Sequence, residues 1–265
     1  MLSPLASIHP QAKIGNNVTV DPFSCIHANV EIGDNTWIGS NVTIYDGARI
    51  GANCKIFPGA VVAAIPQDLK FNGEETIVII GDNTTVRECV TINRGTAAIG
   101  KTEVGNNCLL MAYVHLAHDC IIGNHVILAN SVNLAGHVTI QDWAILEGYV
   151  GVSQFMHIGA HSFVGGQTGV RKNVPPFVKA AREPLSYAGI NSVGLSRRGY
   201  SKEAIEEIQN IYRTIFQRGY NITKAVGIVE DEFEASAHRD VILDFIKASE
   251  KGIIRGPMSS FQRAE

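Results

Sequence analysis

The sequence predicts a mainly-β protein: a parallel β-helix built from hexapeptide repeats, followed by a small α-helical segment. Three observations support this prediction. An aliphatic residue recurs every six positions, a small or β-branched residue follows it four positions later, and the period changes near residue 176. Hexapeptide repeats of this kind are typical of a parallel β-helix. Three repeats form one triangular coil of 18 residues, and stacked coils lie about 4.8 Å apart.

The aliphatic ladder runs from Ile8 to Val170. Of the 28 positions at this spacing, 25 carry Ile, Val or Leu, and the exceptions are Asp68, Glu74 and Ala98. Gly often follows a ladder residue, with Asn or Asp next, which is the chemistry of tight turns because these residues tolerate positive φ. Each hexad therefore reads as a short strand and a turn. The spacing leaves the hand of the coil open, although the crossover rule favours a right hand.

The ladder is interrupted at 63–79 but keeps its phase. Because Val62 and Ile80 lie 18 positions apart, we interpret the interval as one full coil with a loop ejected from it. Loops that leave a rigid scaffold often carry function. A smaller excursion is expected near 93–103.

After Pro175 the spacing becomes helical. Ser201 can cap a helix with Ile205, Ile208 and Ile211 on its apolar face, ended by Gly219. Two further helices are expected near 223–233 and 241–246, and the helical part can cover an open end of the β-helix. The expected domains are a β-helix over 1–190, with its loop ejected at 63–79, and a helical domain over 191–265.

Composition excludes several classes of protein. The chain is 45% hydrophobic and 18% charged, with a net charge of −3, so it is neither a disordered tail nor a strongly basic nucleic-acid binder. Its five Cys are scattered and form no CxxC pair, which argues against a zinc ribbon or a disulfide framework. No signal peptide and no apolar run of about 18 residues is present. We therefore expect a reduced, cytoplasmic protein with no membrane insertion.

Six of the nine His lie between residues 115 and 161. Because residues 18 apart stack directly, His118 should lie below Gly136, and Gly136 below Gln154. Asp119 should lie below His137 in the same way. Gly136 then leaves a notch above His118, where a substrate could meet a backbone N–H. The resulting patch of candidate functional residues comprises His115, His118, Asp119, His137 and Gln154.

Other interpretations of these residues remain open. Any single His could be a solvated turn residue, and the His set could ligate zinc. Hexapeptide carbonic anhydrases use a His-x4-His pair, however, and no two His here are five apart. The thiols of Cys54, Cys108 and Cys120 occupy the small position of the repeat, which suits buried packing better than covalent catalysis.

Two polar segments could bind a substrate. Adjacent Arg197 and Arg198 suit a phosphate, although a solvated basic turn explains them equally well. Gln67, Asp68 and Lys70 stand on the ejected loop, where the same ambiguity holds.

The chain resembles the UDP-N-acetylglucosamine O-acyltransferases, which catalyse the first step of lipid A synthesis. The resemblance extends from the repeats into the helical tail, and the loop, the His-x-x-His-Asp segment and the double Arg are its most specific parts. The matching segments are Ile65–Phe71, Arg87–Thr96, His115–Cys120, Leu134–Val138, Val174–Val178 and Gly189–Ser201.

The resemblance implies a left-handed β-helix and a homotrimer with active sites between neighbouring subunits. It implies transfer of an (R)-3-hydroxyacyl group from acyl carrier protein to the 3-hydroxyl of UDP-GlcNAc. No resident cofactor is implied, because the acyl group arrives on the phosphopantetheine of the carrier protein. His118 matches the family's general base, which suits removal of a hydroxyl proton near neutrality. Asp119 is then the candidate to orient the imidazole, and the Gly136 N–H the candidate oxyanion donor.

The resemblance also suggests roles for the remaining candidates. Gly166 matches a position that borders the acyl groove. His137, Gln154 and Arg197 would lie near the acyl-phosphopantetheine arm. The sugar nucleotide would be held by Gln67, Asp68, Lys70, His115, Asn191 and Arg198. The acidic carrier protein could dock on Arg171, Lys172, Lys179 and Arg182.

Three positions depart from the family pattern: Asn93 and Ser153, where many members have His, and Val193, where many have Glu. These departures leave open a different acceptor, such as the 3-amino analogue of UDP-GlcNAc. The sister N-acyltransferase carries a domain before its repeats, for which a ladder starting at Ile8 leaves no room. An acetyl-CoA-dependent hexapeptide transferase would lack this form of the 67–70 loop. A non-catalytic trimeric scaffold is the remaining alternative.

Overall fold

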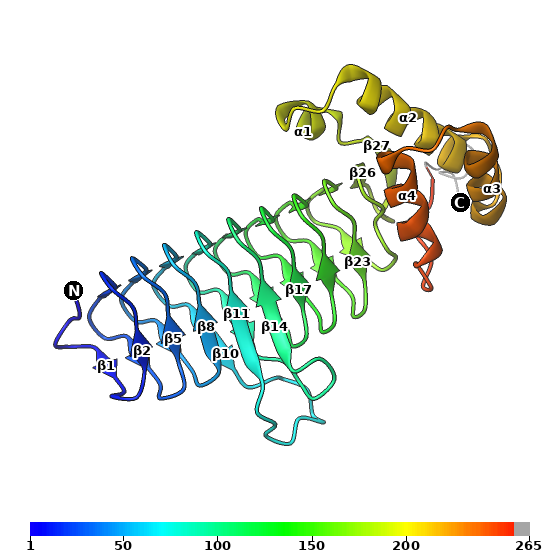
Figure 1. The fold of residues 1–265 in the computed structure, drawn as a ribbon. Coiled ribbons are helices and arrows are strands. Elements are labelled where there is room, and N and C mark those ends of the chain that lie inside the picture. Colours follow the sequence, from blue (N-terminus) through cyan, green and yellow to red (C-terminus); the bar gives the residue numbers. More distant parts are fainter. Residues whose placement is uncertain (257–265) are drawn as a thin grey trace.

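The computed structural model describes residues 1–256 and shows a three-sided prism with helices at its C-terminal end (Figure 1). The coils follow one another along the prism in sequence order, so position in the chain gives height along the axis. Residues 257–265, the end of the expected helical domain, lie outside the described residues. The predicted parallel β-helix of hexapeptide repeats is confirmed.

Each side of the prism is a sheet whose strands pair in parallel with the strand one coil away, except for the final antiparallel pair β26–β27. Sheet I contains β1 (Ser7–Ile8), β4 (Cys25–Ile26), β7 (Thr43–Ile44), β10 (Val61–Ala64), β13 (Thr91–Asn93), β16 (His115–Leu116), β19 (Asn133–Leu134), β22 (Gly151–Val152) and β25 (Gly169–Val170). Sheet II contains β2 (Lys13–Ile14), β5 (Glu31–Ile32), β8 (Ala48–Ile50), β11 (Ile77–Ile80), β14 (Lys101–Val104), β17 (Ile121–Ile122), β20 (Thr139–Ile140) and β23 (His157–Ile158). Sheet III contains β3 (Thr19–Val20), β6 (Trp37–Ile38), β9 (Lys55–Ile56), β12 (Thr85–Val86), β15 (Leu109–Leu110), β18 (Ile127–Leu128), β21 (Ile145–Leu146), β24 (Phe163–Val164), β26 (Val178–Ala181) and β27 (Ser186–Ile190).

The ladder residues fill the inside of the prism. Leu116 pairs with Leu134, 18 positions on, and their exposed fractions are 0% and 1%. Burial of each such side chain stabilises the fold by roughly 1.5–3 kcal/mol. The corners turn through residues at positive φ, which are often Asn, such as Asn17 at 55° and Asn107 at 57°. Asn tolerates this conformation because its short polar side chain bonds locally.

The interpretation of residues 62 to 80 as a full coil is wrong. Val61 pairs with Thr43 on one side, 18 positions away, and with Thr91 on the other, 30 positions away. The extra residues of this coil leave the prism as the loop 65–76, between β10 and β11. The flanking residues 63–64 and 77–79 belong to these strands.

The following coil is also longer than 18 residues. Thr91 pairs with His115, 24 positions on, and the excess forms the excursion 94–100 between β13 and β14. The loop and the excursion therefore leave the prism at the same corner in consecutive coils, and they project side by side in Figure 1.

In the described part of the chain, up to residue 256, four helices follow the prism: α1 (Ser192–Arg197), α2 (Lys202–Gln217), α3 (Ile222–Glu232) and α4 (Ala237–Lys247). Ser201 caps α2 as predicted, by accepting the Ala204 N–H. The short helix α1 was not predicted from the sequence, although Asn191 caps it by accepting the Gly194 N–H. No helix within residues 1–256 is long and apolar enough to cross a membrane.

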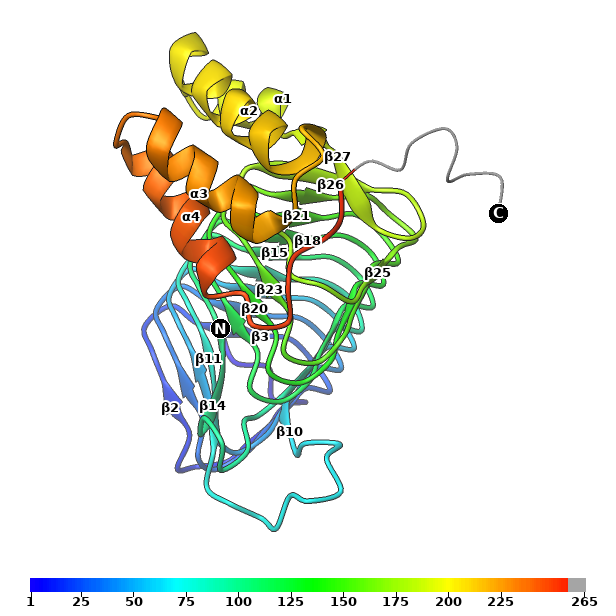
Figure 2. The ribbon, with the colours of Figure 1, turned by 90° about the vertical axis from the view of Figure 1, so that its right-hand side faces the viewer.

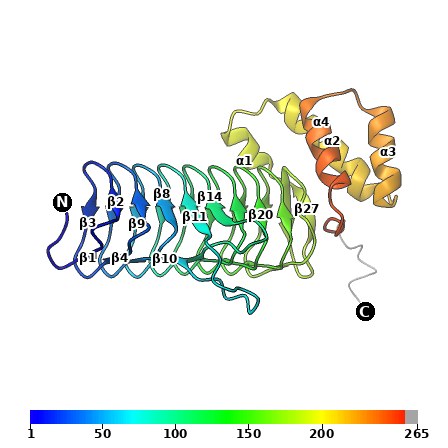
Figure 3. The ribbon, with the colours of Figure 1, turned by 60° about the horizontal axis from the view of Figure 1, so that its bottom comes forward.

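Helix α2 attaches the helical part to the last coils. Its buried Tyr212 hydroxyl donates to the Pro176 carbonyl oxygen at 2.6 Å, and Phe216 stacks on Tyr187 of β27 with ring centroids 4.6 Å apart. In Figure 2, which shows the prism end-on, the helices lie on the side away from the loop 65–76. Figure 3 shows α1 alongside the late coils and the other helices extending past them, at the end of the stack opposite the N-terminus.

Candidate active site

The candidate catalytic residues lie at one corner of the prism. The chain turns from sheet I to sheet II at this corner, which we call the I/II corner. The turn that holds His118 and Asp119 connects β16 to β17. The excursion 94–100 turns at this corner in the preceding coil, and the loop 65–76 leaves it one coil further back. The other two corners are named II/III and III/I in the same way.

His118 and Asp119 form a buried hydrogen-bonded pair. Their side chains have Nδ1 and Oδ2 2.8 Å apart, and the residues are 7% and 1% exposed. Thr96 also bonds this carboxylate: its backbone N–H donates to Oδ1 at 2.9 Å and its hydroxyl to Oδ2 at 2.6 Å. Burial would raise the pKa of Asp119, but the bonds from Thr96 and His118, together with nearby His137, lower it overall. Asp119 is therefore ionised near neutrality, and it holds His118 with Nδ1–H toward the carboxylate.

Gly136 lies directly over the His118 ring, as the register predicted. A Cβ at position 136 would approach His118 Cε1 to 2.5 Å and Nε2 to 2.7 Å, so only glycine leaves the imidazole in place. Among residues 1–256, no group accepts the Gly136 N–H. His118 and Gly136, which stack one coil apart, therefore place a histidine nitrogen near a backbone N–H that has no acceptor in this part of the chain.

The second column of the I/II corner runs through Asp119, His137 and Phe155. The His137 and His118 rings are nearly perpendicular, with centroids 5.1 Å apart, and His137 Nε2 lies 3.7 Å from Asp119 Oδ2. Phe155 stacks on His137 at 4.6 Å. Gln154 is exposed in the coil above Gly136, so its side chain is free to contact a bound molecule.

His115 faces outward from sheet I rather than toward the corner. Its Nδ1 lies 2.7 Å from the Thr91 hydroxyl, and burial lowers its pKa. A shallow groove runs from His115 along the outer face of sheet I to Arg171, with Ser153 on its wall. Small outward residues make this groove, namely Asn133, Gly151 and Gly169.

The loop 65–76 leaves the I/II corner and carries Gln67, Asp68 and Lys70. The Asp68 carboxylate accepts the Lys70 backbone N–H at 3.0 Å. Leu69 is fully exposed and Ile65 is 62% exposed, so the loop presents apolar as well as polar groups to its surroundings.

The remaining candidates lie on the other two corners of the same prism. Gly166 is at the III/I corner, in the turn between β24 and β25, where its N–H donates to Glu147 Oε2 at 3.0 Å. Asn191 lies at the II/III corner, where its Nδ2 donates to the His161 carbonyl oxygen at 2.9 Å. A single chain therefore does not bring these residues to His118.

The two neighbouring arginines have different surroundings. Arg197 ends α1 and is exposed. Arg198 is half-buried at the II/III corner, where its guanidinium lies over the Trp143 ring at 5.2 Å and donates to the Trp143 carbonyl oxygen at 3.1 Å. This packing was not visible in the sequence, because Trp143 lies 55 positions away.

The rival interpretations are weakened by this geometry. His118, Asp119 and His137 offer ligand atoms within 4.8 Å of one another, but Thr96 and His118 already bond both oxygens of Asp119. Cysteine catalysis is disfavoured because burial raises the pKa of Cys108 to about 11 and that of Cys120 to about 12.

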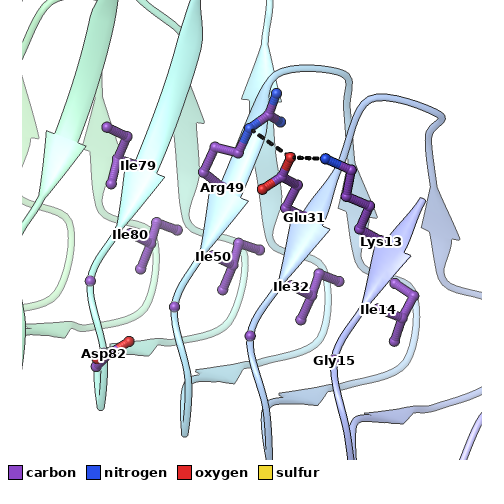
Figure 4. Close-up of a pocket in the computed structure, with 13 residues that line it drawn as sticks. Lys13, Ile14, Gly15, Glu31, Ile32, Arg49, Ile50, Ile79, Ile80 and Asp82 are labelled. Atoms are coloured by element: carbon purple, nitrogen blue, oxygen red, sulfur yellow. Dashed lines mark hydrogen bonds and ion pairs between the residues drawn. The ribbon is translucent and has the colours of Figure 1, made fainter. Parts of the chain in front are cut away.

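A second groove lies on sheet II near the N-terminal end (Figure 4). Lys13 and Arg49 flank Glu31 there, with Lys13 Nζ 2.8 Å and Arg49 Nε 3.7 Å from Glu31 Oε1. Exposed pairs of this kind contribute little to stability. No histidine, cysteine or hydroxyl group lines the groove, and the Glu31 carboxylate is engaged by Lys13.

Comparison with known proteins agrees with this organisation. Residues 29–64 and 101–136 match the bacterial transferase hexapeptide family, and residues 173–254 match "Udp N-acetylglucosamine O-acyltransferase; Domain 2". An acyl-[acyl-carrier-protein]–UDP-N-acetylglucosamine O-acyltransferase from Xanthomonas oryzae is 47% identical over 257 residues, which cover 96% of this chain and 98% of the relative. The chain belongs to the UDP-N-acetylglucosamine O-acyltransferase family.

Solved structures of this family have the same fold. A UDP-N-acetylglucosamine acyltransferase from Bacteroides fragilis matches with a TM-score of 0.94 and 52% identity, over 96% of this chain and 100% of the other. One from Francisella novicida matches with a TM-score of 0.94 and 42% identity, over 98% and 96% of the two chains. The fold is thus the left-handed parallel β-helix, and the general crossover preference for a right hand does not hold here.

The three departures from the family pattern have distinct surroundings. Asn93 is 3% exposed and donates to the Ile65 carbonyl oxygen at 3.1 Å, so it ties the base of the loop 65–76 to β13. Val193 is 61% exposed on α1, and Ser153 is exposed on the sheet I groove. Asn93 therefore acts within the fold, whereas Ser153 and Val193 are available to a bound molecule.

Proposed function

We propose that this protein transfers an (R)-3-hydroxyacyl group from acyl carrier protein to the 3-hydroxyl of UDP-GlcNAc, the first step of lipid A synthesis. Membership of the family supports the reaction. The single observation that carries the mechanism is the buried His118–Asp119 pair beneath the open Gly136 position.

In the proposed mechanism His118 Nε2 removes the proton of the sugar hydroxyl as the hydroxyl oxygen attacks the thioester carbonyl carbon. Asp119 stabilises the imidazolium that forms. The Gly136 N–H donates to the oxyanion of the tetrahedral intermediate. The intermediate then collapses, the C–S bond breaks, and His118 returns its proton to the phosphopantetheine sulfur. Transfer is direct, so no acyl-enzyme forms and no resident cofactor is required.

The homotrimer is part of this proposal. The candidate residues occupy three different corners of one prism, so a site that uses all of them must form between copies. Sheet III supports the same conclusion, because large apolar side chains stand half-exposed on its outer face: Leu109, Ile127, Ile145 and Phe163. In the last three of these coils sheet I presents the smaller residues Asn133, Gly151 and Gly169, which can receive them. A trimer would cover these apolar side chains of sheet III. It would also place Gly166, Asn191 and Arg197 near a neighbour's His118.

The loop residues Gln67, Asp68 and Lys70, with His115 and Asn191, would hold the sugar nucleotide. The acyl-phosphopantetheine arm would pass Gln154 and His137. The acidic carrier protein would dock on the basic residues near the last coils, Arg171, Lys172, Lys179 and Arg182. Because Arg198 is engaged with Trp143, we assign it to the support of α1 rather than to direct nucleotide contact.

Thiol release from a series of (R)-3-hydroxyacyl carrier proteins tests the function. We expect release that requires UDP-GlcNAc and falls about 10²- to 10⁴-fold in His118→Ala. His157→Ala, an exposed histidine of β23, is the matched control and should retain activity. A preference for the 3-amino analogue would change the acceptor and make the product an amide in place of an ester, with the acyl transfer itself retained. Acyl transfer with no loss in His118→Ala would exclude this base, and no release from any donor would exclude the function.

A further inference from the structure

We propose that Thr96 is a positioning residue that tunes the His118–Asp119 pair, and this inference rests on the proposed function. Thr96 lies outside the aliphatic ladder, in the excursion 94–100. It bonds the Asp119 carboxylate and acts through it.

The contacts of the Asp119 carboxylate single out this threonine. Oδ2 accepts two hydrogen bonds, one from the Thr96 hydroxyl at 2.6 Å and one from His118 Nδ1 at 2.8 Å. Oδ1 accepts the Thr96 backbone N–H at 2.9 Å. Thr96 is 8% exposed and Asp119 is 1% exposed, so water does not replace these bonds readily. Thr96 and His118 therefore share one carboxylate oxygen in a site of low dielectric, where such bonds are strong.

Sharing of Oδ2 affects the base itself. The hydroxyl of Thr96 withdraws negative charge from the oxygen that bonds the imidazole. Without the hydroxyl, Oδ2 would attract the His118 proton more strongly, and the imidazolium would be favoured. The ionisable groups that contact Asp119 are His118 and His137, and the latter lies 3.7 Å away. Thr96 thus limits the basicity that Asp119 confers on His118 and fixes the rotation of the carboxylate.

The excursion holds Thr96 rigidly enough for this role. The Thr96 carbonyl oxygen accepts the Gly100 N–H at 2.7 Å, and the Thr76 hydroxyl donates to the Gly95 carbonyl oxygen at 2.6 Å. Residue 95 must be glycine, because a Cβ there would lie 2.3 Å from the Lys101 nitrogen. Thr76 ends the loop 65–76, so the segment that carries Gln67, Asp68 and Lys70 is anchored next to the residue that orients Asp119.

Thr96→Val tests the inference, because it removes the hydroxyl and retains the backbone N–H and the shape. We expect kcat about 10- to 100-fold lower with KM little changed, and an acidic limb of the kcat/KM profile moved to higher pH. Thr96→Ser restores the hydroxyl and should recover most of the activity and the original limb.

Thr102→Val is the matched control. The Thr102 hydroxyl accepts the backbone N–H of the same Asp119 at 2.9 Å and does not touch the carboxylate. We expect this variant to lower the melting temperature and leave the acidic limb where it is. An unmoved limb in Thr96→Val, equal losses in Thr96→Val and Thr96→Ser, or the same shift in Thr102→Val would each overturn the inference.

A readout that does not need turnover separates this inference from the function. Titration of the His118 ring by NMR should give a higher pKa in Thr96→Val than in the natural sequence. If the natural protein transfers no acyl group but the His118 pKa rises in this way, the function fails and the positioning role stands. If transfer is present and the pKa is unchanged, the positioning role fails and the function stands.

Discussion

The His118 imidazole occupies the space that a side chain at position 136 would need. The ring lies 2.5 Å from where a Cβ on Gly136 would be, and both groups belong to the same column of the I/II corner, one coil apart. The identity of the residue above the histidine therefore decides whether the base can keep its place beside Asp119.

We expect Gly136→Ala to inactivate the protein without unfolding it. The methyl group displaces the imidazole from Asp119, and a shift of about 1 Å in a catalytic group can lower the rate about 100-fold. Sugar-dependent thiol release and a thermal melt would show the loss of kcat and the retained fold.

Gly227→Ala is the control for this substitution. A Cβ at position 227 of α3 meets nothing within 4 Å, so the change should leave kcat unaltered. It should raise stability by about 0.5–1 kcal/mol, because alanine favours the helix. Retention of more than half of the activity in Gly136→Ala would show that His118 does not need a residue without a side chain at position 136.

The two adjacent arginines should respond differently to alanine. Arg198→Ala removes a bond to the Trp143 carbonyl and the contact with its ring, so we expect a loss of about 1–2 kcal/mol of stability. Arg197→Ala should leave the melting temperature unchanged. It should raise the KM for the acyl carrier protein donor about tenfold. Equal effects of both variants on melting would contradict this assignment.

Tyr212→Phe should loosen the attachment of the helical part. The substitution leaves the buried Pro176 carbonyl without its 2.6 Å bond from the Tyr212 hydroxyl, at a cost of about 1–2 kcal/mol. Tyr220→Phe, at a residue that is 39% exposed, is the control and should be neutral. Denaturant unfolding of both variants measures the difference, and equal midpoints would show that this bond does not matter.

Stability should fall as the pH is lowered from about 6.5 to about 4. Burial, followed by the Arg198 guanidinium, lowers the pKa of His161 to about 4, whereas an unfolded histidine titrates near 6.5. In this window the unfolded chain binds a proton that the folded chain does not, so acid favours unfolding. Burial lowers the pKa of His115 in the same direction.

His161→Gln should reduce this pH dependence, because glutamine does not titrate and can hydrogen-bond the Tyr200 hydroxyl, which lies 3.2 Å from His161 Nε2. Melting temperatures at pH 7 and pH 4.5 would measure the effect. The exposed His9 provides the control, since His9→Gln should leave the dependence as it is. An unchanged dependence in His161→Gln would show that His161 does not contribute.

The fold and the first part of the site were predictable for the same reason. A coil of constant length makes neighbours of residues 18 apart, so the stacking of His118 below Gly136 and of Asp119 below His137 followed from counting. The roles of these residues remain predictions. The contact of Thr96 with Asp119 could not be predicted from the 18-residue spacing, because the excursion 94–100 lengthens the coil before Asp119. The contact of Arg198 with Trp143 could not be predicted for a related reason, since the helical part and not the repeat brings these two residues together.

The stacking of successive coils along the prism determines the order in which it unfolds. Every coil rests on its neighbours, and strand partners are mostly only 18 positions apart, so the stack can open one coil at a time without loss of the rest. Its two ends are unequal. Helix α2 and β27 seal the last coils, whereas Ile8 and Ile14 of the first coil remain half-exposed. Fraying should therefore begin at the N-terminus, and amide exchange should slow progressively from β1 toward the coil that holds His118.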